Sequence, residues 1–553
     1  MTQLLTPGLR PIRRIRRAAV SLLLALLTAT GTAVAAEAEQ DLDSFVLEAM
    51  RRWSIPGVAV AVVQEDKLVF AKGYGVRQLG RSERVDENST FGIGSVTKSF
   101  TTAATAMLVD EGKLAWDAPI IDYLPAYRLS DPWLTANASI RDLVSHRIGI
   151  EAPLDQLRNG SHEHSVRATR YMRPAAPFRS FYYSNVGYAT LGQVIDDVSG
   201  STWDDFVAGR IFEPLGMTQS HTSEHGFIDA DKLANCWLCT PPPGTPLGRD
   251  ALGNRNDNRA VPHAALAEMG ATERQVRVVP WRSERVVVSA GLINSTARDM
   301  AQWMRLHLNG GEYQGRRLIS AERMNDLHSA QIVAPPFART PGFKPTGYGM
   351  GLSLGTYRGF AAIQHGGGRV GYGAMVWMFP ERKLGIVYLQ NIDQRDGPPL
   401  DLIALRFADH YLGIAHTPED DRKALEGVPF PAMASGTRHP QCSASAPRAN
   451  QAELRRYEGA YRNEAVGEAR VAREGDHLAL TIVDGAVMDL RPAPGGDFTE
   501  CFRGHEQEPT PLRFIHDSKG SVVEFALGDD KPGALIDELR FRRPTAPAES
   551  SSQ

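Results

Sequence analysis

Gly94-Ser95-Val96-Thr97-Lys98-Ser99 opens a stretch that predicts a helix from Ser95 to Leu108, rich in Ala, Thr, Phe and Met and free of Gly and Pro. Residues three apart on a helix lie side by side, so the amine of Lys98 can take the proton of the Ser95 hydroxyl. Free N–H groups at a helix start also favour a developing negative oxygen. The segment therefore predicts a serine nucleophile and its base, although an N-cap serine before a solvated lysine has the same spacing.

Strand patterns lie on both sides of this helix. Two come before it, and three follow a long helical and loop-rich middle that ends near Pro345: Val58–Val63, Leu68–Gly73, Arg358–His365, Tyr372–Phe379 and Lys383–Gln390. A helix from Leu400 to Leu412 closes the unit at Gly413. This order predicts an α/β (α+β) sandwich, in which a mainly antiparallel five-stranded sheet takes strands from both ends of the domain and helices flank it.

A second polar motif, Tyr183-Ser184-Asn185, precedes a predicted helix that begins near Tyr188. A phenol relays protons when nearby cations favour its anion, and an amide can hold a substrate carbonyl. Taken alone, the motif is better explained as an aromatic loop that leads into the helix. It gains weight only together with the other motifs.

A third motif, His365-Gly366-Gly367-Gly368, ends a predicted strand. Glycine lets a substrate backbone lie against a strand edge, and the N–H of Gly368 would complete an oxyanion pocket with that of Ser95. The run from Gly366 to Gly371 also fits the dinucleotide fingerprint G-x-G-x-x-G, which requires a helix to follow. Because a strand is predicted there instead, we reject a nucleotide site.

In this order and these contexts, the three motifs resemble those of the serine β-lactamase and penicillin-binding protein superfamily, nearest to class C β-lactamases, D-Ala-D-Ala carboxypeptidases and related esterases. The resemblance extends from about Ile55 to Gly413. Supporting stretches are Ile55-Pro56-Gly57-Val58, Phe91-Gly92-Ile93-Gly94, Ile140-Arg141-Asp142-Leu143, Phe212-Glu213-Pro214-Leu215-Gly216-Met217 and Ala290-Gly291-Leu292-Ile293.

The resemblance implies a role for each motif residue. Ser95 would be acylated, Lys98 would activate it, and Tyr183 would move a proton to the leaving group and from the deacylating water. Asn185 would orient the substrate. The oxyanion donors would be the backbone N–H groups of Ser95 and Gly368, and the glycine-lined strand at His365, Gly366 and Gly367 would contact the substrate.

The third motif departs from the Lys-Thr-Gly of many β-lactamases. Lysine is a fixed cation for a substrate carboxylate, whereas His365 is expected to be charged only in part near neutral pH. Arg369 is a candidate replacement cation. The departure favours a peptidase, amidase or esterase over a strong β-lactamase.

Other polar clusters predict less. Ser161-His162-Glu163-His164 resembles a metal-binding pattern, but a solvated loop is the better interpretation. His146 follows a predicted helix and is interpreted as structural, and His263 lies in an insert that is expected to border the cleft. The lone pair Cys236 and Cys239, and Cys442 with Cys501, leave disulfide pairing open. We predict no metal and no cofactor.

The 553 residues exceed what one hydrophobic core supports. Residues 1–36 read as a signal peptide: arginines at 13, 14, 16 and 17 precede an apolar run from Ala18 to Leu27, and Ala33-Val34-Ala35 offers a cleavage site. The hydrolase domain is placed at residues 37–425. The protein is thus expected to be exported, periplasmic or secreted, with no membrane span after cleavage.

The C-terminal part has a different pattern. Residues 426–452 are rich in Pro, Ser, Ala and Gly and predict a linker, and short alternating segments over 453–543 predict a small β-barrel. This barrel resembles the lipocalin-like domain attached to some superfamily members, on the evidence of Tyr457-Glu458-Gly459-Ala460-Tyr461. Residues 544–553 predict a disordered tail.

The favoured function is a serine acyl hydrolase that acts through an acyl-enzyme on a D-amino-acid peptide or amide, or on a small ester. Alternatives are a true β-lactamase, a penicillin-binding sensor that is acylated without turnover, and a barrel that binds lipid or protein as the main role. The net charge of −3 gives no indication of a nucleic-acid partner. The partner expected from the hydrolase motifs is a small-molecule or peptide substrate. The oligomeric state stays open.

Overall fold

The computed structural model describes residues 40–150, 162–172, 174–222, 258–268, 275–279, 288–335, 340–393, 399–427, 436–438, 451–464, 467–475, 477–482, 486–492, 498–502, 510–527 and 539–544. The predicted signal peptide lies outside these ranges, as do Cys236, Cys239, Cys442 and the tail from residue 545. Within them, no helix has both the length and the apolar character needed to cross a bilayer.

The main sheet has seven strands, in the order β2-β1-β13-β12-β11-β10-β9, and every neighbouring pair is antiparallel. The strands are β1 (Gly57–Gln64), β2 (Lys67–Gly75), β9 (Phe343–Tyr348), β10 (Ser353–Tyr357), β11 (Phe360–Arg369), β12 (Tyr372–Phe379) and β13 (Leu384–Gln390). The prediction that both ends of the domain share one sheet is confirmed, because β1 pairs with β13.

The predicted number of five strands is too low. The two additional strands, β9 and β10, form the edge beyond β11. The apolar pattern of these two strands is interrupted by Pro345, Gly347 and Gly355. The pairing of β9 with β10 also contains a register shift, as does the pairing of β1 with β2. Strands of this kind carry little periodicity, so the sequence did not reveal them.

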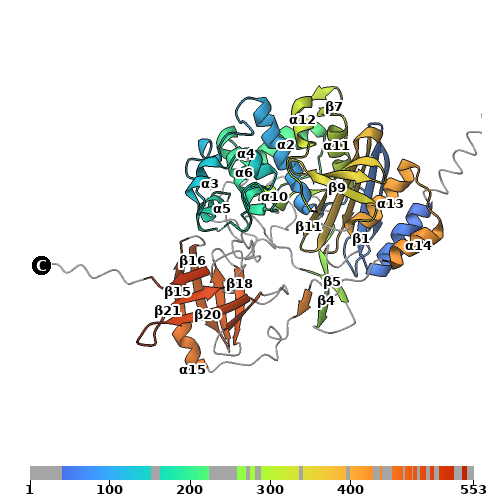
Figure 1. Ribbon diagram of the computed structural model, residues 1–553. Helices are drawn as coiled ribbons and strands as arrows, with labels where there is room; N and C mark the ends of the chain where they lie inside the picture. Colours follow the sequence, from blue (N-terminus) through green and yellow to red (C-terminus); the bar gives the residue numbers. More distant parts are fainter. Residues whose placement is uncertain are drawn as a thin grey trace, which may run out of the picture.

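Helices lie on both faces of the sheet (Figure 1), and an apolar cluster packs on each face. Successive residues of β1 alternate between them: Val58, Val60 and Val62 join the layer that contains α13, whereas Ala59, Ala61 and Val63 join the layer that contains α2 and α11. The site-bearing helices therefore all lie on one side of the sheet.

The other elements of this domain are helices of 3 to 15 residues and small strands. The helices are α2 (Thr97–Asp110), α3 (Pro132–Asn137), α4 (Ile140–Val144), α5 (His162–Ala168), α6 (Asn185–Ser199), α7 (Trp203–Val207), α8 (Glu213–Leu215), α10 (Val288–Gly291), α11 (Ala297–Leu308), α12 (Ala321–Leu327), α13 (Leu400–Leu412) and α14 (Pro418–Glu426). Small strands are β3 (Phe91–Gly92), β4 (His263–Glu268), β5 (Gln275–Val278), β6 (Asn294–Ser295), β7 (Glu312–Tyr313) and β8 (Arg316–Arg317). Within the predicted linker, β14 (Gly436–Arg438) pairs in parallel with β4.

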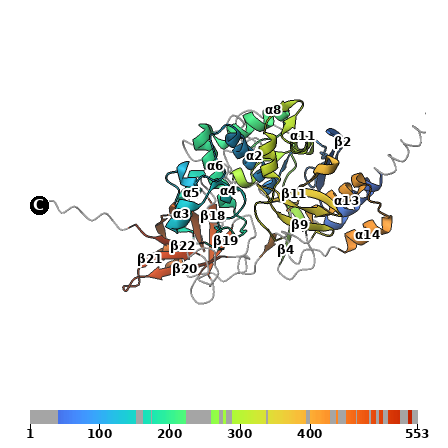
Figure 2. The same ribbon diagram turned by 45° about the horizontal axis from the view of Figure 1, so that its top comes forward.

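The C-terminal lobe is a closed antiparallel barrel of eight strands (Figures 1 and 2). Its strands are β15 (Gly459–Asn463), β16 (Gly467–Glu474), β17 (His477–Ile482), β18 (Ala486–Pro492), β19 (Phe498–Phe502), β20 (Thr510–His516), β21 (Val522–Leu527) and β22 (Leu539–Arg542), and α15 (Gln451–Leu454) precedes them. Aromatic rings such as Tyr461, Phe514 and Phe525 fill its interior. The same apolar cluster includes Met172 and Val186 of the first domain, so the two lobes are in contact.

Candidate active site

Ser95 lies in a single turn of 3-10 helix, Gly94–Val96, directly before α2. Gly94 has φ +52°, in the left-handed region that favours glycine. The helix thus begins two residues later than predicted, and Lys98 is its second residue. Ser95 is partly exposed, whereas Lys98 is completely buried.

The amine of Lys98 connects three parts of the chain. Its Nζ lies 3.2 Å from Ser95 Oγ, 2.6 Å from Asn185 Oδ1 and 3.0 Å from the backbone oxygen of Ala290. The Asn185 and Ala290 oxygens only accept hydrogen bonds, whereas the serine hydroxyl can also donate one. The protonated amine donates to all three oxygens, and once it has lost one proton it can still donate to the two acceptors and accept the Ser95 proton without moving. This arrangement suits a general base.

Tyr183 and Asn185 reach the lysine from the start of α6. Ser184 caps this helix by accepting the N–H of Gly187 at 3.0 Å, which makes Asn185 the first helical residue. The ring centroid of Tyr183 lies 4.7 Å from Lys98 Nζ. The structure thus brings Ser95 and Lys98 of the first motif together with Tyr183 and Asn185 of the second.

His146 packs against the Tyr183-Ser184-Asn185 motif. Its Nδ1 accepts the N–H of Ser184 at 3.0 Å, and its ring lies 4.3 Å from that of Tyr183 between centroids. Burial, and after it the positive charge of Lys98, holds the pKa of His146 well below its usual value. A neutral imidazole therefore packs beneath the phenol.

The glycine-lined strand lies against the Ser95 turn. A Cβ on Gly367 would come within 1.9 Å of the Ile93 carbonyl oxygen and 3.0 Å of the Ser95 nitrogen, so only glycine fits. A Cβ on Gly94 would meet the Gly368 nitrogen at 2.6 Å. The backbones of both predicted oxyanion donors, Ser95 and Gly368, are thereby held in the same small space. Gly366 points to the opposite face, toward Met375 and Leu400.

His365 is neutral rather than partly charged. Its Nδ1–H donates to the Gly366 carbonyl at 2.6 Å, and its Nε2 accepts from the Tyr348 hydroxyl at 3.2 Å. Burial lowers the pKa of His365 to about 3, and the positive charge of Lys98 adds to this shift. The sequence-based expectation of partial charge near neutral pH is therefore wrong, because it took no account of desolvation.

Two functional groups escaped the sequence analysis. Tyr348, completely buried in β9, completes the hydrogen bonding of His365. The Ala290 carbonyl, which accepts from Lys98, belongs to a stretch noted only as support for the family resemblance. A backbone oxygen has no residue-type signature, so no sequence signal identifies it. Tyr348 was detectable only as an aromatic residue between two glycines.

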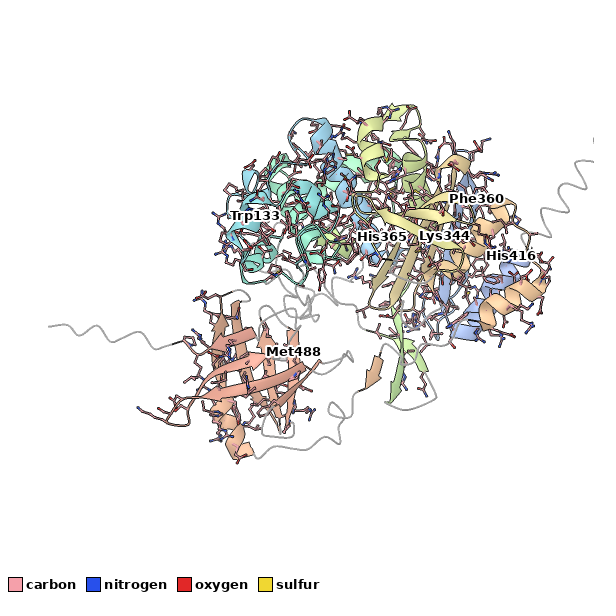
Figure 3. All side chains as sticks on the ribbon, viewed as in Figure 1. Trp133, Lys344, Phe360, His365, His416 and Met488 are labelled. Atoms are coloured by element: carbon pink, nitrogen blue, oxygen red, sulfur yellow. The ribbon has the colours of Figure 1, made fainter. Side chains whose placement is uncertain are left out.

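The other candidates lie elsewhere or act differently. Arg369 is buried on the face of Gly367 and donates to Asn294 at 3.3 Å, so it does not replace the missing lysine. His263 is buried, with Nδ1 bonded to the Asn391 carbonyl at 2.9 Å and Nε2 accepting from Leu79 N–H at 3.1 Å. It stabilises the fold rather than bordering a cleft. Figure 3 labels His365 at the junction of the sheet and the helical layer.

The predicted solvated loop at residues 161–164 is wrong for His162, which is buried at the start of α5. Its Nδ1 lies 2.9 Å from Asp196, and its Nε2 lies 3.0 Å from Ser289 Oγ. Local polarity suggested solvent, but partners 34 and 127 residues away in sequence bury the ring. Within the described ranges, no three side chains are arranged to hold a metal ion.

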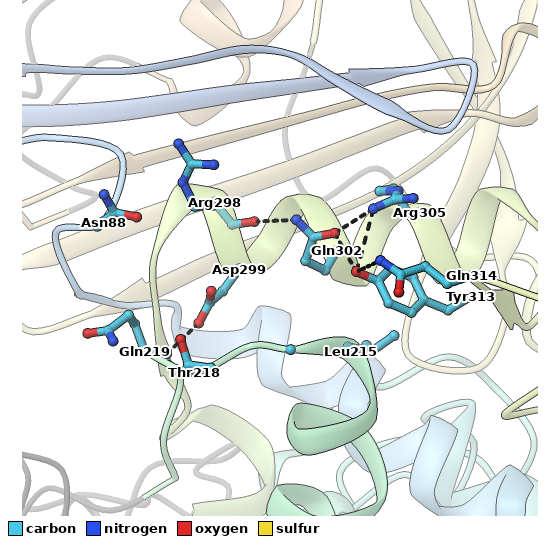
Figure 4. Close-up of a pocket in the computed structure, with 11 residues that line it drawn as sticks. Asn88, Leu215, Thr218, Gln219, Arg298, Asp299, Gln302, Arg305, Tyr313 and Gln314 are labelled. Atoms are coloured by element: carbon cyan, nitrogen blue, oxygen red, sulfur yellow. Dashed lines mark hydrogen bonds between the residues drawn. The ribbon is translucent and has the colours of Figure 1, made fainter. Parts of the chain in front are cut away.

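A pocket of about 610 Å³ lies on the outer face of α11, and none of the predicted site residues lines it (Figure 4). Several of its polar groups bond one another: Gln302 accepts from both Arg305 and Tyr313, and Asp299 accepts from the N–H of Gln219. It is distinct from the Ser95 site, whose chemistry depends on different elements.

The β-lactamase family model matches residues 42–408, well over half of the chain. The chain belongs to the β-lactamase family. Members of this family are mostly serine hydrolases. A second model, described as a domain of unknown function (DUF3471), matches residues 443–543, the region of the barrel.

Curated relatives include an unguisins hydrolase of Aspergillus violaceofuscus, 27% identical over 69% of this chain and 66% of that protein. Penicillin-binding protein 4 of Amycolatopsis lactamdurans is 28% identical over 61% of this chain and 81% of its own length. The chain spans 66% and 61% of the length of two unguisins hydrolases that it matches.

Solved structures extend the likeness in fold to both lobes. The octameric penicillin-binding protein homologue from Pyrococcus abyssi has a TM-score of 0.54 and 20% identity, covering 91% of this chain and 99% of that chain. SurE has a TM-score of 0.52 and 21% identity, covering 92% of this chain and 100% of its own. At these identities the likeness concerns the fold alone.

Proposed function

We propose that this protein is a serine acyl hydrolase that forms an acyl-enzyme on Ser95 and cleaves an amide, peptide or ester. One observation carries the proposal: Lys98 Nζ hydrogen bonds Ser95 Oγ, Asn185 Oδ1 and the Ala290 carbonyl at once. Two of these partners orient the amine, and the third is the hydroxyl that it deprotonates. Family membership supports the same class of reaction.

In acylation, the proton of Ser95 passes to Lys98 while Oγ forms a bond to the substrate carbonyl carbon. The carbonyl oxygen becomes an oxyanion, which the N–H groups of Ser95 and Gly368 stabilise. Both donors belong to backbones that glycine brings into contact, so they are placed before the charge develops. Asn185 holds the substrate beside the lysine.

Collapse of the tetrahedral intermediate breaks the bond to the leaving group, which takes a proton through Tyr183. The position of the phenol beside Lys98 supports this transfer, since the lysine has just received the serine proton. A water molecule then gives a proton back along the same route and attacks the acyl carbon. Ser95 is released with its hydrogen restored.

The third motif supports a substrate without a carboxylate next to the scissile bond. His365 is uncharged and Arg369 is directed toward Asn294, so neither supplies the cation that a penicillin requires. We therefore propose a D-amino-acid peptide or amide, or a small ester, and place β-lactamase activity and acylation without turnover as alternatives. Two relatives named as unguisins hydrolases support a hydrolytic reaction.

A substrate panel with intact-protein mass spectrometry tests the proposal. We expect turnover of D-amino-acid amides or short esters, a mass increase on Ser95 with a fluorophosphonate, and weak cephalosporin hydrolysis. A single acylation event without turnover favours the sensor, and fast cephalosporin hydrolysis favours the β-lactamase. Equal labelling of Ser95→Ala and wild type refutes the nucleophile.

We also propose that residues 1–36 are removed during export and that residue 425 ends the hydrolase domain, with the barrel beginning near residue 453. The basic and apolar segments before Ala33-Val34-Ala35 support the first point. Mass spectrometry of the extracytoplasmic protein should find a mature N-terminus near residue 37. An intact Met1 in that fraction would refute cleavage.

A further inference from the structure

A second serine, far from the first in sequence, lies in a hydrogen-bonded chain with a histidine and an aspartate. Ser289 Oγ lies 3.0 Å from His162 Nε2, and His162 Nδ1 donates to Asp196 Oδ2 at 2.9 Å. We call Asp196, His162 and Ser289 the buried relay. The residue types and distances resemble those of a hydrolytic triad, but the Ser289 hydroxyl gives its only hydrogen to the Tyr188 carbonyl, at 2.9 Å, rather than to His162. Nothing in the Ser95 chemistry uses these three residues.

The buried relay has no room for a substrate. Ser289 is completely buried and His162 is 8% exposed. The space between them is filled by helix α6, where a Cβ on Gly192 would lie 2.4 Å from the His162 ring and 2.5 Å from Ser289 Oγ. Glycine inside a helix is unfavourable, so its presence here indicates that close approach matters at this point. The relay is therefore not a second active site.

Its connection to the first site runs through α10. Ser289 is held at two points: its hydroxyl donates to the Tyr188 carbonyl at 2.9 Å, and its own carbonyl accepts from Thr101 Oγ1 at 2.5 Å. The next residue is Ala290, whose carbonyl accepts from Lys98 Nζ at 3.0 Å. Asp196 anchors the other end, because its Oδ1 accepts the N–H of Trp203 at 2.5 Å.

We propose that the buried relay consists of positioning residues that hold the Ala290 carbonyl in place, and thereby orient the Lys98 amine toward Ser95. This inference rests on the proposed function of Lys98. The relay contacts neither substrate nor the reacting atoms. It acts because a carbonyl that moves away leaves the lysine free to rotate off the line to Ser95 Oγ.

The test measures the acylation rate constant of Ser289→Ala with a fluorophosphonate or an activated ester, together with kcat, KM and thermal stability. We expect acylation to slow by about 10- to 100-fold, since displacement by an ångström has effects of this size, while KM stays unchanged. Asp196→Asn, at the partly exposed end of the relay, should show a smaller loss in the same direction.

Ser220→Ala is the matched control. Ser220 is also a buried serine, bonded to Asp299 Oδ2 at 2.8 Å and to Ser295 Oγ at 2.7 Å, and these partners belong to α11 and β6 rather than to α10. It should lose stability without slowing acylation. Equal slowing in Ser220→Ala and Ser289→Ala would mean that the relay has only a general structural role, and would overturn the inference.

The outcomes separate this inference from the proposed function. If Ser95→Ala abolishes labelling and Ser289→Ala acylates at the wild-type rate, the relay is refuted and the nucleophile stands. If Ser95→Ala still labels fully, both proposals fail. Should Ser289→Ala not fold, the acylation rate of Asp196→Asn decides, and a wild-type rate there refutes the relay.

Discussion

Two serines in this molecule lie at nearly the same distance from a side-chain nitrogen, yet their surroundings differ. Ser95 Oγ is 3.2 Å from Lys98 Nζ and partly exposed, with the glycine-lined strand beside it. Ser289 Oγ is 3.0 Å from His162 Nε2 and completely buried, with helix α6 packed against it. A hydroxyl beside a lysine or histidine nitrogen is therefore not sufficient for a nucleophile.

The difference lies in how glycine is used. At Gly94 and Gly367 the missing side chains let two backbones meet, which gathers N–H donors at an accessible hydroxyl. At Gly192 the His162 ring and the Ser289 hydroxyl occupy the space that a side chain would take, so no open volume remains. The absence of a glycine side chain thus helps to form a reaction site in one place and a close-packed support in the other.

Exchange of the open serine should have the largest effect. Ser95→Ala removes the atom that carries the acyl group, so turnover should fall by about a million-fold, as in other serine hydrolases that lose their nucleophile. Peptide mapping after fluorophosphonate treatment of the wild type should find the label on Ser95. A label on Ser289 would contradict the comparison, because that hydroxyl is predicted to be inaccessible.

The next effect concerns the two neighbouring glycines of β11. An alanine Cβ at Gly367 would lie 1.9 Å from the Ile93 oxygen, so the strand must move away from Ser95. Because this displaces an oxyanion donor, we expect kcat to fall by about 100- to 1,000-fold. Gly366→Ala meets Met375 Sδ at an ordinary 3.4 Å and should lose much less. Equal losses measured by steady-state kinetics would refute the proposed oxyanion geometry.

A third test uses the buried histidine of the open site. The pKa of His365 falls from 6.5 to about 3 on folding, so the unfolded chain takes up this proton first. The contribution of neutral His365 to stability is therefore fully present above pH 6.5 and is lost as pH falls toward 3. His365→Gln should reduce the slope of unfolding free energy against pH in this window by about 1.4 kcal/mol per pH unit. The unfolding free energy is measured by denaturant titration at each pH. Plots of this free energy against pH that run parallel for the two proteins would contradict the assignment.

The smallest effect is expected at the closed site. Gly192→Ala places a Cβ 2.4 Å from the His162 ring, and overpacking of this kind costs about 1–3 kcal/mol, partly offset by better helix propensity. The matched control is Gly209→Ala, in the helical turn Ala208–Phe212, where a Cβ meets nothing within 4 Å. The denaturation midpoint should fall for the first variant and rise for the second. A rise for both would show that the closed site has spare room.

Much of the site was predictable because its residues occur in short, ordered motifs. Ser95 and Lys98 share one helix start, and Asn185 follows directly on the capping serine of α6, so local spacing identified them. The motif at His365 was also recognised, but its charge was not, since burial by distant segments sets the pKa. His162 was misread for the same reason: its polar neighbours in sequence are not its neighbours in space.

The fold divides in the same way. Strands β1, β12 and β13 are continuous apolar runs, whose pattern alone predicts a buried strand. Strands β9 and β10 are interrupted by Pro345, Gly347 and Gly355, and they form ladders because β11 offers an edge to β10 and β10 offers one to β9. Pairing with an existing edge is a tertiary event, and local propensity does not register it.

By itself, the sequence determined the residue types that can react, the family they belong to and the order of the main elements. Only the tertiary structure decided which serine has space around it, which histidines are neutral, and which backbone oxygen holds the lysine. The physical reason is that composition and spacing are local, whereas accessibility, desolvation and backbone hydrogen bonding arise from segments more than a hundred residues apart.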